Sequence, residues 1–182
     1  MRLLLLRHAK SDWPVSDEID DHERPLSERG RRAAPQMADY MRAKGYEPAL
    51  VLCSTARRTK ETLKLLLPSF KKAPRIRYDR KLYLAEWPVL LAAVQKAPAT
   101  ASPLLLIGHN PGLEHLAIAL ALQPQTVAER GRAQRLAQKF PTAALAVIDF
   151  DATGWRSAKP GLGQLTDYVR PKDLKGAKDT GR

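Results

Sequence analysis

The sequence predicts an α/β domain with a largely parallel sheet, and three observations support this fold class. Short apolar runs alternate along the chain with longer segments of helical periodicity. The runs at residues 3–6 and 104–107 are apolar throughout, which is typical of strands buried on both faces, and residues 143–150 form a longer segment rich in Ala, Val and Ile. No internal repeat or low-complexity linker breaks the alternation. Such an order of strands and helices is typical of a parallel sheet whose crossover helices pack on its faces.

The first helix is expected at residues 27–44. Ser27 is a typical N-cap residue, and Gly45 is suited to the position after the last turn. Between them, Met37 and Met41 are one helical turn apart, so one face of the helix is apolar. The segment therefore has both end signals and a face to bury.

The other elements are predicted from apolar runs for strands and from periodic segments for helices. Two more strands and two more helices are expected, the strands at residues 49–53 and 75–78 and the helices at residues 55–67 and 86–97. A fourth helix is expected to begin with Asn110 as its N-cap and Pro111 at its first position.

Length and charge bound the domain organisation and the partners. The chain has 182 residues, and we predict a single domain over residues 1–182. Its formal net charge is +12, which attracts nucleic acid, acidic membranes or phosphorylated substrates. Part of this charge lies in a basic C-terminal tail, expected from about residue 156. Within it, residues 155–158 and 165–169 fit either edge strands or tail.

Cysteine content and hydropathy indicate a compartment. Cys53 is the only cysteine, so no disulfide can form within the chain, as is usual in reducing compartments. The apolar run at residues 3–6 is too short for a signal peptide, and no stretch approaches the roughly 20 apolar residues of a membrane span. We therefore expect a cytoplasmic monomer without membrane contact.

Polar residues follow three of the predicted strands: Arg7 with His8, then Ser54, then Gly108 with His109. Ligands of parallel sheets bind outside the carboxyl ends of the strands, so these residues can converge on one crevice. A neutral imidazole is a good nucleophile toward phosphorus. A planar guanidinium can bind two phosphate oxygens at once. His8 is therefore the candidate nucleophile, and Arg7 is a candidate phosphate ligand.

Two successive arginines open the second helix. Arg57 and Arg58 are about 100° apart around a helix, so only one can readily point into a site. Arg57 can pair with Glu61 one turn later. Arg58 is therefore the better phosphate ligand.

His109 has two interpretations. It could donate a hydrogen bond to a phosphoryl oxygen in the transition state, or it could be a structural histidine. Helix N-termini at Thr55 and Asn110 can add backbone N–H donors. Ser11 is a further candidate substrate-binding residue through its hydroxyl. No spacing of His, Asp and Glu resembles a metal site, and no organic cofactor is implied.

Together these elements resemble the histidine phosphatase superfamily, which includes cofactor-dependent phosphoglycerate mutase. The Arg-His-Gly signature of that family corresponds to Arg7, His8 and Ala9, with Ala in place of Gly. The second histidine of the family follows an apolar strand, as His109 does. The second arginine of the family follows a Ser by four positions and precedes a Thr by four, which is the spacing of Arg58 here.

The resemblance covers the chain from Met1 to about Phe150 and carries several implications. The implied fold is a phosphoglycerate mutase-like three-layer sandwich, in which helices flank a mostly parallel central sheet. The short length and residues 24–30 and 108–111 are similar to the phosphohistidine phosphatase SixA branch. The implied activity is a metal-independent phosphatase that forms a covalent phosphohistidine intermediate. The implied catalytic residues are His8, Arg7, Arg58 and His109.

The acid that protonates the leaving group is less defined. Larger members of the family use a Glu in a Leu-x-Glu context, but the aligned position here is Leu84. Glu86, two residues later, is the candidate general acid, although it also suits the first turn of the next helix. An alkoxide leaving group needs a proton donor, whereas imidazole leaves easily once its ring is protonated. We therefore predict protein phosphohistidine as the substrate.

Three alternatives remain open at this stage. A general phosphomonoesterase of the same superfamily would act on a small phosphorylated substrate. A tyrosine phosphatase-like site would use Cys53 as nucleophile, but that loop requires an Arg at position 59, which is Thr, and contains no Gly. A nucleic-acid-binding protein would fit the charge, but aromatic residues are few and no recognition motif is present.

Overall fold

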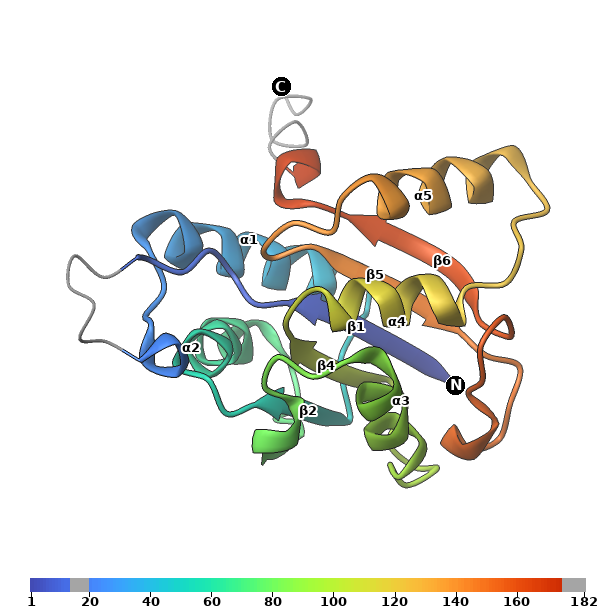
Figure 1. Cartoon of the computed structure of the whole chain (residues 1–182), viewed down its shortest axis with the longest axis horizontal. Helices are drawn as coiled ribbons and strands as arrows, with labels where there is room; N and C mark the ends of the chain where they lie inside the picture. The colour runs from blue at the N-terminus through green and yellow to red at the C-terminus, as the bar shows by residue number, and fades with distance from the viewer. Residues whose placement is uncertain (14–19, 175–182) are drawn as a thin grey trace.

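The computed structural model describes residues 1–13 and 20–174, which form one six-stranded sheet with helices on both faces (Figure 1). The strands are β1 (Arg2–Arg7), β2 (Leu50–Ser54), β3 (Arg75–Asp79), β4 (Leu104–Gly108), β5 (Leu145–Asp149) and β6 (Gln164–Val169). The α-helices are α1 (Glu28–Ala43), α2 (Arg57–Leu66), α3 (Trp87–Gln95), α4 (Gly112–Leu120) and α5 (Val127–Gln138).

The sheet has the strand order β3-β2-β4-β1-β5-β6. Strands β3, β2, β4 and β1 are mutually parallel, whereas β5 runs antiparallel to β1 and β6 runs antiparallel to β5. The predicted largely parallel sheet is therefore confirmed. Strands β1 and β4 are central neighbours, and Arg7 pairs with Gly108 at their carboxyl ends.

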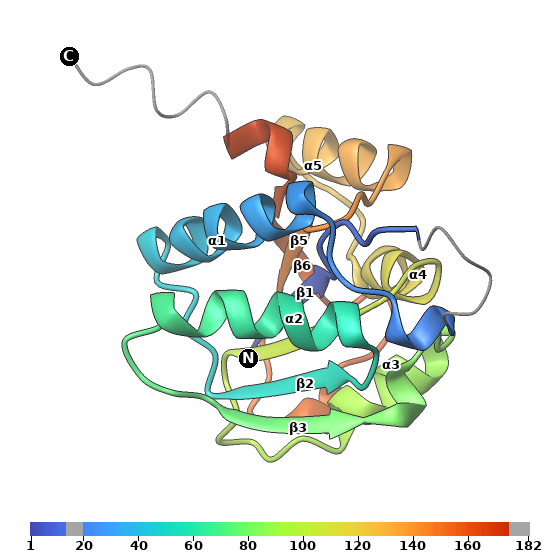
Figure 2. The ribbon, with the colours of Figure 1, turned by 90° about the vertical axis from the view of Figure 1, so that its left-hand side faces the viewer.

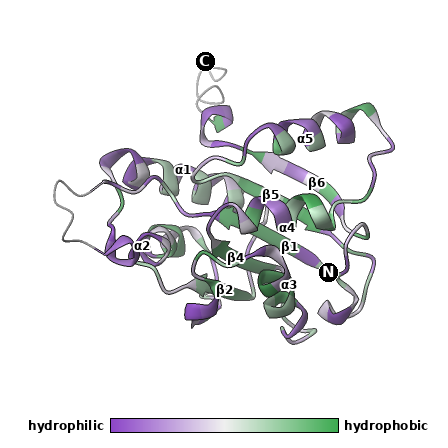
Figure 3. Cartoon of the chain, viewed as in Figure 1, coloured by the Kyte–Doolittle hydropathy of each residue, from purple (hydrophilic) through white to green (hydrophobic). Residues whose placement is uncertain are grey.

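Helices cover the two faces of the sheet in two groups, which confirms the three-layer arrangement. Alternate strand residues such as Leu4 and Ile107 pack against α1 and α2, which lie side by side in Figure 2. The intervening residues, such as Leu5 and Leu106, pack against α3, α4 and α5. Because both faces are covered, the central strands are continuously apolar, as their hydropathy shows (Figure 3).

The end signals of α1 act as the sequence predicts. The Ser27 side chain accepts a hydrogen bond from the backbone N–H of Gly30, at 3.2 Å. Gly45 has a φ of +69°, a conformation that glycine adopts without steric cost. Met37 and Met41 are buried against the sheet.

Two helix predictions need correction. Asn110 does not cap α4, which begins at Gly112 with Pro111 in the cap position. The Asn110 amide instead donates hydrogen bonds to Glu114 Oε2 and to the Phe140 carbonyl. Helix α5 was not predicted at all, because among its residues only Leu136 is buried and its apolar face is narrow.

For the segment from about residue 156, the structure decides between the two alternatives, because residues 165–169 lie in an edge strand rather than in a tail. Residues 155–157 form a short 3₁₀ helix, and β6 forms the edge of the sheet beside β5. Residues 171–174 form a further 3₁₀ turn, and residues 175–182 lie outside the described residues. Within the described part of the chain, no helix has the length and apolar character required to cross a membrane.

Candidate active site

A pocket of about 300 Å³ lies at the carboxyl edge of the parallel strands. It is lined by residues from the ends of β1 and β4, from the start of α2 and from the loop before α1. The sequence-predicted residues Arg7, His8, Ser11, Arg58 and His109 all line it. The structure therefore brings together five of the six candidate site residues.

His8 follows β1 and is 7% exposed. Its Nδ1 lies 2.7 Å from the Ala9 carbonyl oxygen, which can only accept a hydrogen bond. Nδ1 therefore carries the ring proton, and Nε2 keeps its lone pair. Burial, opposed by the Ala9 hydrogen bond but reinforced by nearby arginines, lowers the pKa of His8 to about 3. The ring is thus neutral at physiological pH, with the lone pair of Nε2 unprotonated.

His109 lies beside His8 because β1 and β4 are adjacent and in register. The two ring centroids are 5.1 Å apart. His109 Nε2 lies 2.8 Å from Ser54 Oγ at the end of β2, whereas its buried Nδ1 has no hydrogen-bond partner. Burial and the neighbouring His8 lower the pKa of His109 to about 2. A neutral ring with one uncommitted nitrogen is suited to contact a ligand.

Arg7 is held in place by the chain that precedes β5. Its Nη1 donates to the Phe140 carbonyl oxygen at 2.8 Å, and its buried Nε has no partner. The Asn110 amide donates to the same carbonyl at 3.0 Å, while its buried Oδ1 is also unpaired. Burial lowers the pKa of Arg7, a direction that the charge of Arg58 reinforces.

Arg58 is 3% exposed and is paired with a carboxylate that the sequence did not single out. It donates to the backbone carbonyl of Asp21 and, at 2.9 Å, to Asp21 Oδ2. Tyr83 and Arg24 also donate to this carboxylate. Burial alone would raise the pKa of Asp21, but the hydrogen bonds from Tyr83 and the two arginines hold it well below its usual range.

Arg24 is a third arginine of the pocket that residue-level reasoning missed. It donates to Ser11 Oγ at 3.0 Å and to the Asp12 carbonyl, and its guanidinium lies 3.7 Å from the centroid of the exposed Trp13 ring. Ser11 is thereby fixed at the pocket wall. Spacing gives no signal for Arg24, since a loop brings it to the site.

Comparisons with known proteins identify the family of the chain. Residues 3–88 match the histidine phosphatase superfamily (branch 1). An uncharacterised protein of Mycobacterium tuberculosis is 36% identical over 167 residues, which is 92% of this chain and 100% of the relative. The chain belongs to the histidine phosphatase superfamily.

Solved structures of the same superfamily place the chain beside the SixA branch. A structure from Nakamurella multipartitia, assigned as the phosphohistidine phosphatase SixA, has a TM-score of 0.77 and 29% identity, covering 93% of this chain and 95% of that one. One from Agrobacterium tumefaciens, with the same assignment, has a TM-score of 0.74 and 30% identity, covering 93% and 97%. The predicted family, fold and phosphatase class are therefore confirmed.

Glu86 does not line the pocket of this histidine phosphatase. It is the N-cap residue of α3 and lines an adjoining cavity with Trp87 and His115. Leu84, in the position that the family fills with Glu, lines both cavities. In the described residues, the carboxylate that lines the His8 pocket is Asp21 instead.

Cys53 lies in the interior of β2 and is fully buried. Burial raises the pKa of its thiol to about 12, so the reactive thiolate is absent at neutral pH. The arginine that would accompany a cysteine nucleophile, Arg58, faces the His8 pocket instead. The geometry thus favours His8 over Cys53 as the nucleophile.

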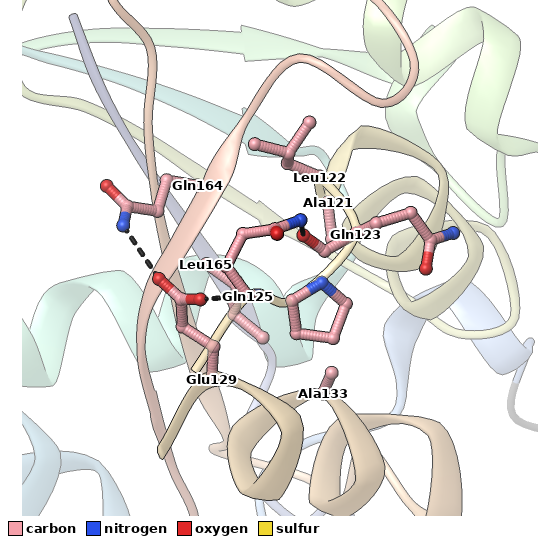
Figure 4. A pocket seen from close by; sticks show the side chains of 9 residues that line it. Ala121, Leu122, Gln123, Gln125, Glu129, Ala133, Gln164 and Leu165 are labelled. Atoms are coloured by element: carbon pink, nitrogen blue, oxygen red, sulfur yellow. Dashed lines mark hydrogen bonds between the residues drawn. The ribbon is translucent and has the colours of Figure 1, made fainter. Parts of the chain in front are cut away.

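A separate hollow of about 80 Å³ lies between the end of α4, α5 and β6 (Figure 4). Its one carboxylate, Glu129, accepts hydrogen bonds from the side chain of Gln164 and from the backbone of Gln125 and Thr126. It has no histidine or cation in its lining. The reactive groups of this histidine phosphatase are therefore not gathered there.

Proposed function

We propose that the chain hydrolyses phosphohistidine on proteins, with His8 as the nucleophile and Arg7, Arg58 and His109 as phosphate-binding groups. The observation that carries the proposal is the neutral His8 ring, whose Nε2 lone pair is free beside the half-buried Arg7 and the buried Arg58. This combination binds a dianion and attacks it without a metal ion.

The first step transfers the phosphoryl group. His8 Nε2 attacks phosphorus in line, a new P–N bond forms, and the P–N bond of the substrate breaks. The leaving imidazole takes the electron pair of that bond and departs as a neutral ring when its other nitrogen carries a proton. In the second step water attacks phosphorus, His8 leaves, and phosphate is released with a proton.

Unpaired polar atoms of Arg7 and His109 support their proposed role in stabilising the charge of a phosphoryl group. Arg7 Nε and His109 Nδ1 are buried without partners, and such atoms are costly to leave unsatisfied. A bound phosphoryl group would supply acceptor oxygens at this place. Ser11 is proposed to contact the substrate from the pocket wall, with Arg24 as its support.

The position of Glu86 supports the choice of substrate. An alkyl phosphate needs a proton donor for its alkoxide, and Glu86 lies in the adjoining cavity rather than in the pocket. Asp21 is a poor donor because its hydrogen bonds hold the pKa of its carboxyl below the usual range. A phosphohistidine leaving group avoids this requirement. We propose the cytoplasm as the compartment, which the single cysteine favours.

The decisive experiment traps a phosphoryl group on His8 during turnover. The P–N bond of such an intermediate is stable in base and breaks in acid. Wild-type chain and His8→Ala are quenched in base within milliseconds of mixing with ³²P-labelled phosphohistidine protein, and the label is mapped by mass spectrometry. Label on His8, and none in the variant, is expected. A rate on a small alkyl phosphate equal to that on phosphohistidine would instead favour a general phosphomonoesterase.

A further inference from the structure

A groove lined with cations adjoins the His8 pocket. Its volume is about 230 Å³, and Lys10 and Thr142 line both the groove and the pocket. The cations of the groove come from four separate segments of the chain and are Lys10, Arg29, Lys139, Arg170 and Lys172.

The topology of the sheet brings one wall of the groove to the carboxyl edge of the parallel strands, where His8 lies. Strand β6 is antiparallel to β5, which is antiparallel to β1, so β6 and β1 run in the same direction. Leu145 pairs with Leu6 on one side and with Val169 on the other. Arg170 therefore leaves the sheet at the same edge as His8.

Helix α1 fixes the opposite wall. The backbone N–H and the hydroxyl of Ser27 both donate to the Lys10 carbonyl oxygen, at 2.9 and 3.1 Å. A Cβ at Gly30 would lie 2.1 Å from the same oxygen, so only glycine allows the first turn of α1 to sit on this loop. Arg29 is thereby held beside Lys10, two residues from the nucleophile.

The positive charge of the groove is largely uncompensated. Arg170 is bound by Asp173 through two hydrogen bonds of 3.0 and 3.1 Å. Within the described residues, the other four cations form no ion pair at 4 Å or less, and all four are exposed. Like charges gathered in one groove repel each other, and an anion bound in the groove would reduce the repulsion.

We propose that this groove binds acidic side chains that flank the phosphohistidine of a protein substrate, an inference that rests on the proposed function. Exposed lysines on long stems form weak individual ion pairs, so they suit several carboxylates on a segment better than one compact anion. An extended segment advances about 3.3 Å per residue, so acidic residues within roughly four positions of the phosphohistidine can reach the groove.

The test uses the full chain and two phosphohistidine peptides that differ only in their flanks, Asp and Glu in one and Asn and Gln in the other. At low salt, kcat/KM is expected to be roughly tenfold higher for the acidic peptide, since several weak pairs add to the encounter rate. In the double variant Lys139→Glu, Lys172→Glu this preference should fall to about one or reverse.

A matched control reverses the same charge elsewhere. Lys71 and Lys72 are exposed and precede β3, which is the edge strand farthest from β6 in the sheet. The variant Lys71→Glu, Lys72→Glu should keep the preference for the acidic peptide. Equal loss in both double variants would show a general field effect and would overturn the assignment to the groove.

A binding measurement separates this inference from the proposed activity. Fluorescence anisotropy of the acidic peptide with unphosphorylated histidine should report tighter binding to wild type than to the Lys139→Glu, Lys172→Glu variant. If neither phosphopeptide is hydrolysed but this difference remains, the activity proposal fails and the groove proposal stands. Equal binding of the acidic and neutral peptides, or tighter binding of single-stranded DNA of the same charge, would overturn the groove proposal.

Discussion

The His8 pocket and the hollow between α4 and α5 differ in how completely their buried polar atoms are hydrogen-bonded. In the hollow, the Glu129 carboxylate is hydrogen-bonded to its neighbours and completes the cap of α5. In the pocket, Arg7 Nε, His109 Nδ1 and Asn110 Oδ1 are buried without partners. These are the only buried side-chain atoms of this kind in the described residues. The Glu129 carboxylate of the hollow therefore serves the fold, whereas these three atoms of the pocket stay unpaired although they are buried.

The unpaired atoms of the pocket have an energetic consequence. Each buried polar atom without a partner costs about 1–3 kcal/mol. The surrounding structure enforces this arrangement, because the Phe140 carbonyl oxygen holds both Arg7 and Asn110 in place. Groups fixed in this way need not reorganise when charge develops on a phosphoryl group. The comparison thus predicts large functional effects in the pocket and small structural effects in the hollow.

The largest effect is expected for His8→Ala. Removal of the proposed nucleophile should lower kcat/KM on phosphohistidine peptide by at least about a thousandfold, since the group that forms the covalent intermediate in our proposal is lost. Steady-state phosphate release measures the loss. The matched control is Cys53→Ala, which should change kcat/KM less than about twofold, because the thiol is buried and protonated. An inactive Cys53→Ala beside an active His8→Ala would reverse the assignment.

The next effect concerns the two successive arginines of α2. Arg58→Ala should lower kcat about 100- to 1,000-fold, because in our proposal Arg58 is a preorganised donor to the transferring group. Arg57→Ala is the control, since Arg57 pairs with Glu61 at 2.8 Å on the surface and should change kcat less than about twofold. Rates measured on the same peptide compare the two variants directly. Similar losses in both would mean that α2 as a whole, rather than Arg58, is required.

Much of the His8 pocket could be predicted from the sequence, because several of its residues directly follow strands. Continuous apolar runs identify the central strands, and the residue after each run must emerge at one edge of a parallel sheet. His8 and His109 are adjacent because Arg7 pairs with Gly108. The choice of Arg58 over Arg57 required only the helical repeat and the position of Glu61.

The rest of the contrast depends on tertiary contacts that local patterns do not encode. Asp21 and Arg24 reach the pocket from the segment before α1, and Tyr83 donates to Asp21 from the turn after β3. Glu86 was a reasonable candidate acid by its position in the sequence, yet the chain turns it into the adjoining cavity. Helix α5 escaped prediction because a polar helix with one buried residue has no clear periodicity.

Acid stability tests the electrostatics of the pocket. The folded-state pKa of His8 is about 3, well below its ordinary value near 6.5, so the unfolded chain binds a proton that the folded chain excludes. The unfolding free energy should therefore fall as pH drops from about 6.5 toward 3, by up to about 1.4 kcal/mol per pH unit for this residue. Urea denaturation of wild type and His8→Gln at pH 4.5, 5.5 and 6.5 measures it. The variant should show the shallower dependence, and identical slopes would contradict a buried neutral His8.

The smallest effect is expected beside the hollow, where Thr126→Ala removes the side chain that caps α5 and bonds the backbone of Glu129. The Thr126 hydroxyl accepts a hydrogen bond from the backbone of Glu129 at 3.2 Å, and loss of an N-cap costs about 1 kcal/mol of stability. Thr126→Ser keeps this hydrogen bond and should restore most of the lost stability. Activity on phosphohistidine peptide should remain within about twofold in both variants, because no side chain of this hollow lines the His8 pocket. A tenfold loss of kcat with little change in stability would show that α5 communicates with the pocket, and the division between a structural hollow and a reactive pocket would then be wrong.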